Sequence, residues 1–388
     1  MSDGIIRNRF NISLGRILGI KVDLHISFFI ILILLGVFLS IRTFRVLGFG
    51  IGFGGLDIPI YQRWVMGMIT STLIFTTLFM HELAHSLIST REGYKVRGIT
   101  LFMLGGMSKA DTFPEDPATE LKIAGVGPLV SVLIGSASLL LRSWMSYYVP
   151  IGEGPFLIIA VFLASVGFYN LIIGIFNLIP AFPLDGGRIL RSLLGNFMDH
   201  HQATLRAARI GKAIAIVMGI FGVFTVNLLL ILIAVFVYMG AKNEKDVTEA
   251  MHALHDLPIK KIMRSRPRSV KPDLSLDDLK ERMMRERRRI YLVKRRGKII
   301  GIVSMEDLRA AMKGQTEANR VSDIMKKDFV RTSPDDEASE VWKRMLKEGA
   351  TRVIVIKKGA VKGQVTMADF RNAIDINELS SLSGSWTR

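Results

Sequence analysis

The stretch His81-Glu82-Leu83-Ala84-His85 lies near the end of a run, residues 64–88, that is otherwise apolar or hydroxylic. On a helix, residues four apart project from one face, about 6 Å from each other. Two imidazoles at that spacing can share a zinc ion, and the adjacent Glu82 can take a proton from a metal-bound water. The alternative is three unrelated polar residues at a helix end. Ionisable groups inside an apolar span are expensive and usually face a functional interior, so we expect a metal site.

The chain divides by composition into two parts. Residues 1–240 contain several nearly uncharged runs of about 18 residues or more, each long enough to cross a bilayer. Residues 241–388 contain no such run, and we expect them to be soluble. The larger share of the net charge of +17 lies in this second part, scattered among apolar, strand-like segments. That pattern favours a cytoplasmic domain beside an anionic membrane over a nucleic-acid-binding domain. Cysteine is absent, which excludes disulfides, thiolate zinc sites and iron–sulfur clusters.

The apolar runs predict six membrane spans. They are residues 24–41, 64–88, 121–141, 155–179 and a pair within 205–241 that bends near 225–227. An even number of spans places both termini on one side, and Lys and Arg concentrate there, so the positive-inside rule predicts cytoplasmic termini. No small-residue cleavage site follows the first span, so we expect it to stay as an anchor. His25, at its start, is either an interfacial histidine or a site residue.

Two segments between the spans and at the N-terminus are β-rich. Residues 5–22 predict one or two short strands at the membrane surface, and residues 94–110 end in Gly105-Gly106. Glycines in a strand let another backbone approach closely. The third span opens with Gly125, Gly127 and Pro128, and small residues there permit tight packing against a neighbouring helix.

The fourth span ends in Asn177-Leu-Ile-Pro-Ala-Phe-Pro-Leu-Asp185, where two prolines break the helix. Irregular backbone at membrane depth is tolerated where it lines a cavity inside the protein. Asp185 is either the N-cap of the next helix or a carboxylate ligand that completes the histidine pair. We favour the ligand, because zinc held by two imidazoles needs a third protein ligand. Asn177 is either a hydrogen-bonding contact between helices or a donor to a polarised carbonyl.

An internal repeat occupies the soluble part. Ile262-Met263 recurs 62 residues later as Ile324-Met325, and several further positions agree at the same offset without a gap. One copy alone is too small to bury a good core, so we expect the two copies to pack together. Ser304 and Asp307 in the first copy match Thr366 and Asp369 in the second. These residues are either helix caps or, with the same geometry, groups that bind sugar hydroxyls.

The two metal motifs together resemble those of the site-2 proteases, the intramembrane zinc metalloproteases. This resemblance implies that His81, His85 and Asp185 bind one zinc ion, that Glu82 is the general base and that Asn177 assists the polarised carbonyl. The Gly-Gly and Gly-Pro motifs of the family correspond to Gly105-Gly106 and Gly127-Pro128. One departure is Val126, which stands where the family commonly has alanine, and it bears on local packing alone.

The repeat resembles a tandem pair of CBS (cystathionine-β-synthase-type) domains, which a subgroup of site-2 proteases carries at the C-terminus. In that pattern, Gly-x-x-Ser/Thr-x-x-Asp resembles the adenosine-nucleotide motif. The resemblance therefore implies that Ser304, Asp307, Thr366 and Asp369 bind ATP, ADP or AMP. It also implies a possible homodimer through the CBS domains.

We therefore expect a membrane α-helical fold of six transmembrane helices with a small membrane-surface β-sheet, followed by a cytoplasmic α/β tandem CBS pair. The expected bounds are 1–243 for the protease, 244–256 for a linker, and 257–314 and 315–380 for the two CBS domains. The expected substrate is a peptide bond in or near a transmembrane segment of a membrane protein, and the lipid bilayer is the other expected partner. We expect the substrate segment to be unwound and held by backbone pairing with an edge strand within residues 94–110. The competing class is a CBS-gated transporter, channel or sensor without proteolytic activity. That class predicts charges scattered over several helices, whereas the sequence has a metal triad with an adjacent base.

Overall fold

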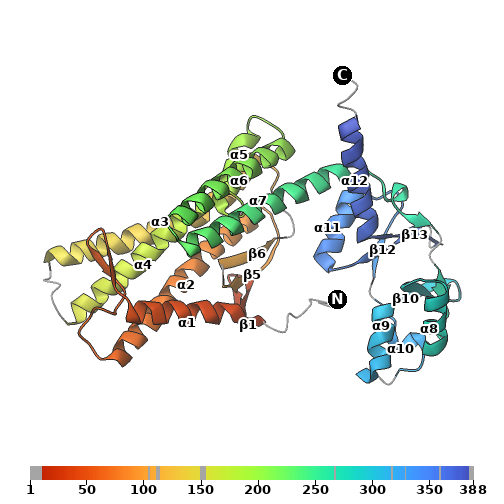
Figure 1. The fold of residues 1–388 in the computed structure, drawn as a ribbon, viewed down its shortest axis with the longest axis horizontal. Coiled ribbons are helices and arrows are strands. Elements are labelled where there is room, and N and C mark those ends of the chain that lie inside the picture. Colours follow the sequence, from red (N-terminus) through yellow and green to blue (C-terminus); the bar gives the residue numbers. More distant parts are fainter. Residues whose placement is uncertain are drawn as a thin grey trace. The chain divides into compact units, whose positions relative to one another are not determined.

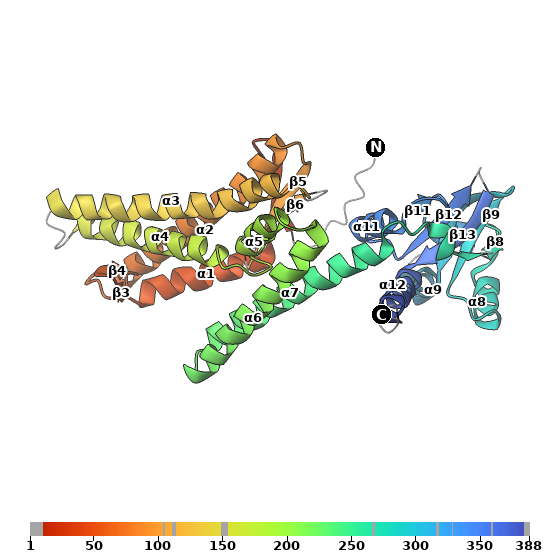
Figure 2. The same ribbon diagram turned by 90° about the horizontal axis from the view of Figure 1, so that it is seen from above.

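The chain forms two compact units, residues 1–246 and 247–388. The structure is a computed structural model, and it describes residues 11–103, 105–110, 114–148, 154–265, 268–315, 318–327, 329–357 and 360–383. Figures 1 and 2 show the helices of the first unit and the strands and shorter helices of the second. Each unit is described by itself below.

The first unit is mainly helical. Its helices are α1 (Ile26–Ile41), α2 (Ile60–Arg91), α3 (Pro117–Tyr148), α4 (Pro155–Asn177), α5 (Asp185–Gly195), α6 (His200–Phe224) and α7 (Leu228–Leu254). Within the part of the chain that the structure describes, four helices are long and apolar enough to cross a membrane, namely α2, α3, α4 and α6. The predicted break near 225–227 is confirmed, because α6 ends at Phe224 and α7 begins at Leu228.

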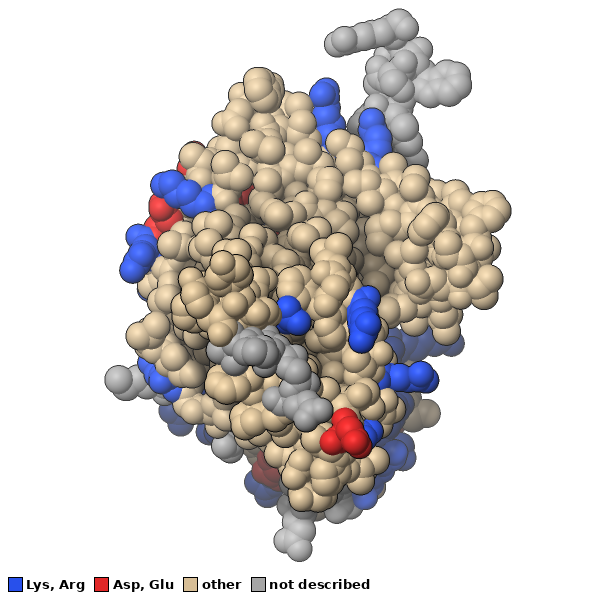
Figure 3. All heavy atoms as spheres, turned by 90° about the vertical axis from the view of Figure 1, so that its left-hand side faces the viewer, with Lys and Arg blue, Asp and Glu red and all other residues tan. Residues whose placement is uncertain are grey.

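The predicted count of six spans is confirmed only in part. Helix α1 has 16 residues, which is short for a span. The apolar half of α7 runs into Lys242, Glu244 and Lys245, so its charge-free stretch is also short. The end of the molecule that faces the viewer in Figure 3 is mostly uncharged, with scattered Lys and Arg side chains.

A four-stranded sheet accompanies the helices. Its strands are β1 (Asn11–Ile17), β2 (Ile20–His25), β5 (Val96–Phe102) and β6 (Gly105–Ala110), in the order β1-β2-β5-β6. Strand β2 runs parallel to β5, and the other two pairs are antiparallel. The β-rich prediction for residues 94–110 is confirmed. Because β6 is the last strand in this order, it forms an edge next to α2, as the ribbon in Figure 1 also shows.

One core cluster joins the sheet to the first two helices. Ile99 and Leu101 of β5 pack with Phe28 of α1 and Phe75 of α2, and all four side chains are buried. This packing holds the sheet against the helix that bears the histidines. A separate hairpin of β3 (Phe44–Val46) and β4 (Phe49–Ile51) follows α1, and the sequence analysis did not predict it.

The second unit contains two sheets, ordered β10-β9-β8 and β11-β12-β13-β7. The strands are β7 (Arg264–Ser265), β8 (Ser269–Val270), β9 (Ile290–Arg295), β10 (Lys298–Ser304), β11 (Val330–Thr332), β12 (Arg352–Lys357) and β13 (Ala360–Thr366). The helices are α8 (Leu276–Arg285), α9 (Met305–Ala310), α10 (Val321–Ile324), α11 (Ala338–Glu348) and α12 (Met367–Ser383), with a 3-10 turn at Ile259–Lys261 and a π-turn at Ala311–Gln315.

The repeat predicted from the sequence is visible in the elements. Strands β9 and β10 of the first copy begin and end 62 residues before β12 and β13 of the second. The copies are also joined, because β7 of the first copy pairs with β13 of the second. Each copy has its own buried cluster, one around Tyr291 and one around Phe370. Two packed copies therefore form one unit, as expected from the size of each copy.

Candidate metal centre

The two histidines of α2 point into the interior of the first unit. Exposure is 2% for His81 and 9% for His85, so both imidazoles are buried. Their Nε2 atoms lie 3.1 Å apart. Oδ2 of Asp185 lies 3.2 Å from Nε2 of His81 and 3.1 Å from Nε2 of His85. One ligand atom from each of three residues therefore converges on a single point.

This spacing fits a zinc ion. Ligands bound tetrahedrally to zinc at about 2.0–2.1 Å are separated from one another by about 3.3 Å. The three atoms here are close to that separation, and as a group they lie within 4.8 Å of one another. Two imidazoles and one carboxylate are a ligand set that zinc commonly takes, with a fourth position left open for chemistry.

The other ring nitrogens of the histidines are also held. Nδ1 of His85 lies 2.6 Å from the carbonyl oxygen of Ile123. A carbonyl only accepts hydrogen bonds, so Nδ1 of His85 is the donor and carries the proton, which leaves a lone pair on Nε2 for a metal. Nδ1 of His81 lies 3.0 Å from Oγ of Ser131, which is fully buried on α3. Helix α3 thus orients both rings, and Ser131 is a partner that the sequence analysis missed.

Asp185 is the first residue of α5, which follows the proline-containing break after α4. The N-cap of this helix is Leu184, and no side chain caps it. The alternative in which Asp185 is an N-cap is therefore wrong, because its carboxylate is directed at the histidines instead. The interruption between α4 and α5 is what brings the Asp185 carboxylate to α2.

Two glycines make room at the centre. A Cβ atom at Gly127 would lie 2.1 Å from Nε2 of His85 and 2.6 Å from Nε2 of His81. A Cβ atom at Gly106 would lie 2.2 Å from Cγ of Glu82. Since real Cβ atoms do not approach so closely, only glycine fits at either position without displacing these groups. The prediction of tight packing at Gly127 is confirmed, and at Gly106 the close neighbour is a side chain rather than a backbone.

Glu82 follows His81 on α2 and lies against the sheet. It is partly buried on α2, and its side chain lies against Gly106 of the edge strand β6. A carboxylate there adjoins both the converging ligand atoms and the strand edge. This is the position that a proton acceptor needs if a peptide is to be attacked beside β6.

Asn177 and His25 each make local hydrogen bonds in the structure. Asn177 ends α4, and its amide donates to the carbonyl of Ile173 one turn earlier, 3.0 Å away. Among the described residues, its side chain makes no hydrogen bond to His81, His85 or Asp185. His25 is the N-cap of α1 and accepts a hydrogen bond from the backbone of Ser27. It stacks on Phe102 and lies outside the converging group.

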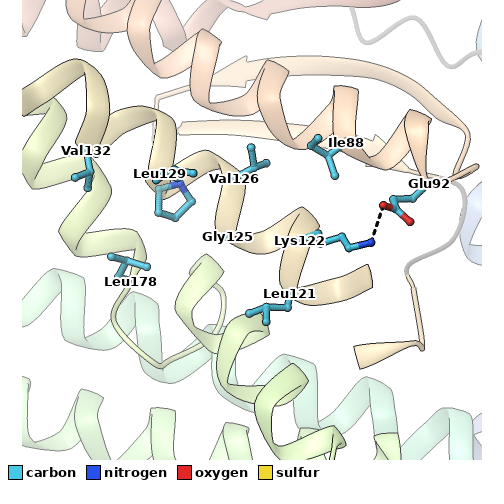
Figure 4. A pocket seen from close by; sticks show the side chains of 10 residues that line it. Ile88, Glu92, Leu121, Lys122, Gly125, Val126, Leu129, Val132 and Leu178 are labelled. Carbon is cyan, nitrogen blue, oxygen red and sulfur yellow. Dashed lines mark hydrogen bonds and ion pairs between the residues drawn. The ribbon is translucent and has the colours of Figure 1, made fainter. Parts of the chain in front are cut away.

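A cavity of about 640 Å³ lies on the opposite face of α3. Figure 4 shows its lining, which is mostly apolar and includes Val126 and Leu129, with the ion pair of Glu92 and Lys122 at one end. The residues of α3 that face the histidines, among them Gly127 and Ser131, lie on the other side of the helix. The departure at Val126 therefore falls on the cavity side and away from the ligand atoms.

The repeat residues act as helix caps, and they also have partners across the repeat. Ser304 and Asp307 form a reciprocal capping box at the start of α9, and Thr366 and Asp369 make the same bonds at α12. Nζ of Lys326 lies 2.9 Å from Asp307, and Nε of Arg264 lies 2.5 Å from Asp369.

Arg264 and Lys326 occupy equivalent positions of the two copies, so each carboxylate pairs with a cation of the other copy. Burial disfavours the charge of Asp307, but the hydrogen bonds from Ser304 and Lys326 outweigh it and lower the pKa of this carboxyl. The 62-residue offset was the signal that could have identified these cations from the sequence.

Comparison with known proteins agrees with this organisation. The family model described as a CBS domain matches residues 259–314 and 321–376, and the model for peptidase family M50 matches residues 145–221. A zinc metalloprotease of Methanocaldococcus jannaschii is 32% identical over 370 residues, covering 95% of this chain and 98% of the relative. Rip3 of Mycobacterium tuberculosis is 28% identical over 391 residues, covering 97% and 96%.

Among solved structures, a site-2 protease from Methanocaldococcus jannaschii is 35% identical and covers 61% of this chain and 95% of its own, with a TM-score of 0.41. The identity to the full-length relative extends over nearly the whole of both chains, and it includes the segments that hold the histidines, the aspartate and the repeat. The chain therefore belongs to peptidase family M50, the site-2 protease family of zinc metalloproteases, and it carries two CBS domains in its C-terminal part.

Proposed function

We propose that this zinc metalloprotease cleaves peptide bonds in or near transmembrane segments of membrane proteins, with His81, His85 and Asp185 as the metal ligands and Glu82 as the general base. The observation that carries this assignment is the convergence of Nε2, Nε2 and Oδ2 from residues up to 104 positions apart. Buried groups of this kind are costly inside an apolar bundle unless they serve a site. The competing transporter or channel class does not require such a convergence.

Zinc bound at this point supplies Lewis acidity to the scissile carbonyl and lowers the pKa of a water towards about 7. The chain's own residues supply the remaining steps. Glu82 accepts the proton of the attacking water and delivers it to the leaving amine. The carbonyl of Ile123 and the hydroxyl of Ser131 keep the two rings in the orientation that presents Nε2 to the metal. Asn177, whose amide is bonded within α4, is proposed to assist the polarised carbonyl only after a change of rotamer.

The edge strand β6 is the proposed place of substrate binding. A peptide bond in a helix is hydrogen-bonded and hidden, so a substrate segment must unwind before attack. An extended segment added to β6 would have its backbone satisfied by the strand and would lie beside Glu82, which touches Gly106. The same strand would hold the unwound segment and place its peptide bond beside the proposed base, Glu82.

The test is Glu82→Gln in the full chain. Purified protein would be assayed for zinc by mass spectrometry and for cleavage of a tagged single-span substrate. We expect about one zinc per chain with turnover lost, because glutamine keeps size and hydrogen bonding but accepts no proton. Glu92→Gln is the matched control, since it removes a carboxylate near the end of the same helix that pairs with Lys122 outside the centre. Full activity in Glu82→Gln would contradict the assignment.

We further propose that the CBS pair binds an adenine nucleotide through Ser304, Asp307, Thr366 and Asp369, and that binding tunes proteolysis. The support is that the hydroxyl and carboxylate of each copy lie together at a helix start, where a ribose can share their hydrogen bonds. The proposed orientation has both termini in the cytoplasm, since Lys and Arg concentrate on that side of the predicted spans. A homodimer through the CBS domains belongs to the same proposal.

A further inference from the structure

An ion triad with two buried members joins three helices of the first unit. Arg191 of α5 donates through Nε and Nη2 to Oε1 of Glu120 on α3, at 2.9 and 2.5 Å. Through Nη1 it donates to Oε1 of Glu244 on α7, at 2.6 Å. The Arg191 and Glu120 side chains are only 7% and 5% exposed, and that of Glu244 is 35% exposed. The guanidinium fork therefore links α3, α5 and α7 at one point.

Such a triad fixes geometry. Arginine stays charged and has a rigid fork of donors, so its two carboxylate partners are held in defined directions. Separating the helices would leave the buried charges of Arg191 and Glu120 uncompensated, which is costly. The ion pair therefore resists separation of the helices. The adjacent Ser192 adds a hydrogen bond from Oγ to the carbonyl of Pro117, at 2.6 Å. Helix α5 is thus tied firmly to the start of α3.

Helix α5 begins with Asp185, the proposed zinc ligand. Arg191 lies six residues later on the same 11-residue helix, about 9 Å along its axis. A short helix moves as a rigid body, so whatever positions Arg191 also positions the Asp185 carboxylate. The two partners of Arg191 therefore restrain the helix that carries Asp185.

Helix α7 touches the same segment at a second point. A Cβ atom at Gly240 would lie 2.3 Å from Cδ of Pro183, so the backbones meet closely two residues before Asp185. Gly240 and Glu244 are four residues apart and lie on one face of α7. Between them Ala241 is buried with Phe182. One face of α7 therefore holds the chain on both sides of Asp185.

Helix α7 also crosses the division between the two units. It runs from Leu228 to Leu254, and the first unit ends at Asp246. The chain therefore passes from the Asp185 contacts into the second unit along one continuous helix. A rotation or shift of α7 would move Glu244, which bonds Arg191 of α5, and Gly240, which contacts Pro183 just before α5.

We propose that Arg191 is a positioning residue for Asp185, and that its bond to Glu244 makes the geometry of the metal centre depend on the position of α7. This inference rests on the proposed role of Asp185 as a zinc ligand. It adds a physical route by which the C-terminal unit controls metal binding and turnover. Arg191 acts through Asp185 and does not itself touch the substrate.

The test measures zinc loss from the intact protein. Full-length chain loaded with zinc would be mixed with a chelator, and release would be followed in Glu244→Gln and in the matched control Asp246→Asn, an exposed carboxylate two residues later on α7. We expect release to be about fivefold faster or more in Glu244→Gln, the lower end of typical coupling between sites, and unchanged in the control. The visible spectrum of the cobalt-substituted protein should shift in Glu244→Gln, since it reports ligand geometry.

A second variant covers the case in which Glu244→Gln fails to fold. The double change Glu120→Gln with Arg191→Leu removes the link and both buried charges, and it leaves unpaired only Glu244, which is 35% exposed. It should also release zinc faster, while the melting temperature of the zinc-free chain stays near that of wild type. A lowered melting temperature with normal release from the folded protein would mean that the triad is only structural and would overturn the inference.

The inference and the proposed function fail in different ways. Wild-type chain that holds no zinc would overturn the proposed function and, with it, this inference. Wild-type chain that holds zinc, with release as slow in both triad variants as in Asp246→Asn, would overturn this inference alone.

Discussion

Oδ2 of Asp185 lies 3.1 Å from Nε2 of His85, although the two residues are 100 positions apart in the chain. The aspartate reaches this point because α4 ends at Asn177 and α5 starts at Asp185, so a new helix begins beside the histidines. Helix α3 lies behind both rings and holds their second nitrogens. Three separate helices therefore build the candidate metal centre, and the contribution of each can be tested by a single change.

Replacing Asp185 with alanine should remove both zinc and activity. The carboxylate is the proposed third ligand, and two imidazoles alone hold zinc weakly. A capping residue would instead cost about 1 kcal/mol of stability and leave zinc in place. Zinc would be counted per chain in the purified variant. A value near one would contradict the ligand role.

Replacing Ser131 with alanine should weaken zinc binding by about tenfold or more, the usual effect of losing a partner that orients a metal-bound histidine. The hydroxyl lies 3.0 Å from Nδ1 of His81, and no other change at the ring is introduced. Affinity would be measured by competition with a chelator. Ser138→Ala is the matched control, because this serine is on the same helix and bonds its own backbone at Ile134. Equal affinity in the two variants would show that Ser131 does not orient the ring.

The sequence was sufficient to single out the three residues whose side chains converge, but not the residues that support them. His81 and His85 are recognisable by their helical spacing, and Asp185 by the prolines that end the helix before it. Ser131 and the triad of Glu120, Arg191 and Glu244 depend on which helices pack together. A single sequence does not encode that information in any local pattern.

The hairpin of β3 and β4 was missed because its turn has an unusual sequence. Leu47 and Gly48 both have positive φ, as the favoured two-residue hairpin turn requires. Leucine is rare at such a position, where asparagine or aspartate gives the usual signal.

The count of six spans was predicted from hydrophobic runs alone. Such runs do not show where a helix starts, and α1 begins only at Ile26.

A proline scan of β6 should identify the strand edge that binds substrate. Strand β5 is paired on both sides, so the edge is formed by β6, and the informative changes are those at residues 105–110. In an antiparallel pair, alternate residues direct their N–H groups to the partner strand or away from it. Of Met107→Pro and Ser108→Pro, one therefore breaks the pairing with β5 and the other removes only an outward N–H group.

The outward change should raise the apparent KM or abolish cleavage while zinc content stays at wild-type level, because it removes a bond to the substrate and nothing from the metal centre. Kinetics would be measured on a single-span substrate with zinc quantified in the same preparations. Unchanged cleavage in both variants would show that the edge has no part in substrate binding.

Nucleotide binding to the CBS pair should require displacement of the cations that now pair with its carboxylates. Arg264 forms an ion pair with Asp369, and Lys326 forms one with Asp307. A ribose that bonds these carboxylates therefore competes with the two cations. Arg264→Gln and Lys326→Gln should therefore strengthen nucleotide binding if ribose contacts dominate, and weaken it if the cations turn to the phosphates. Asp307→Ala and Asp369→Ala should abolish binding at their own site.

Calorimetry with ATP, ADP and AMP on full-length protein measures these effects, and cleavage of a single-span substrate in the same solutions measures the coupling. A typical coupling of 1–3 kcal/mol would change activity by about 5- to 150-fold. A ligand can shift activity only by binding one arrangement of the protein more tightly than another. Heat of binding without any change in cleavage would therefore separate a nucleotide site from a regulatory one. No heat from any nucleotide, with cleavage indifferent to all three, would leave Ser304, Asp307, Thr366 and Asp369 as helix caps alone.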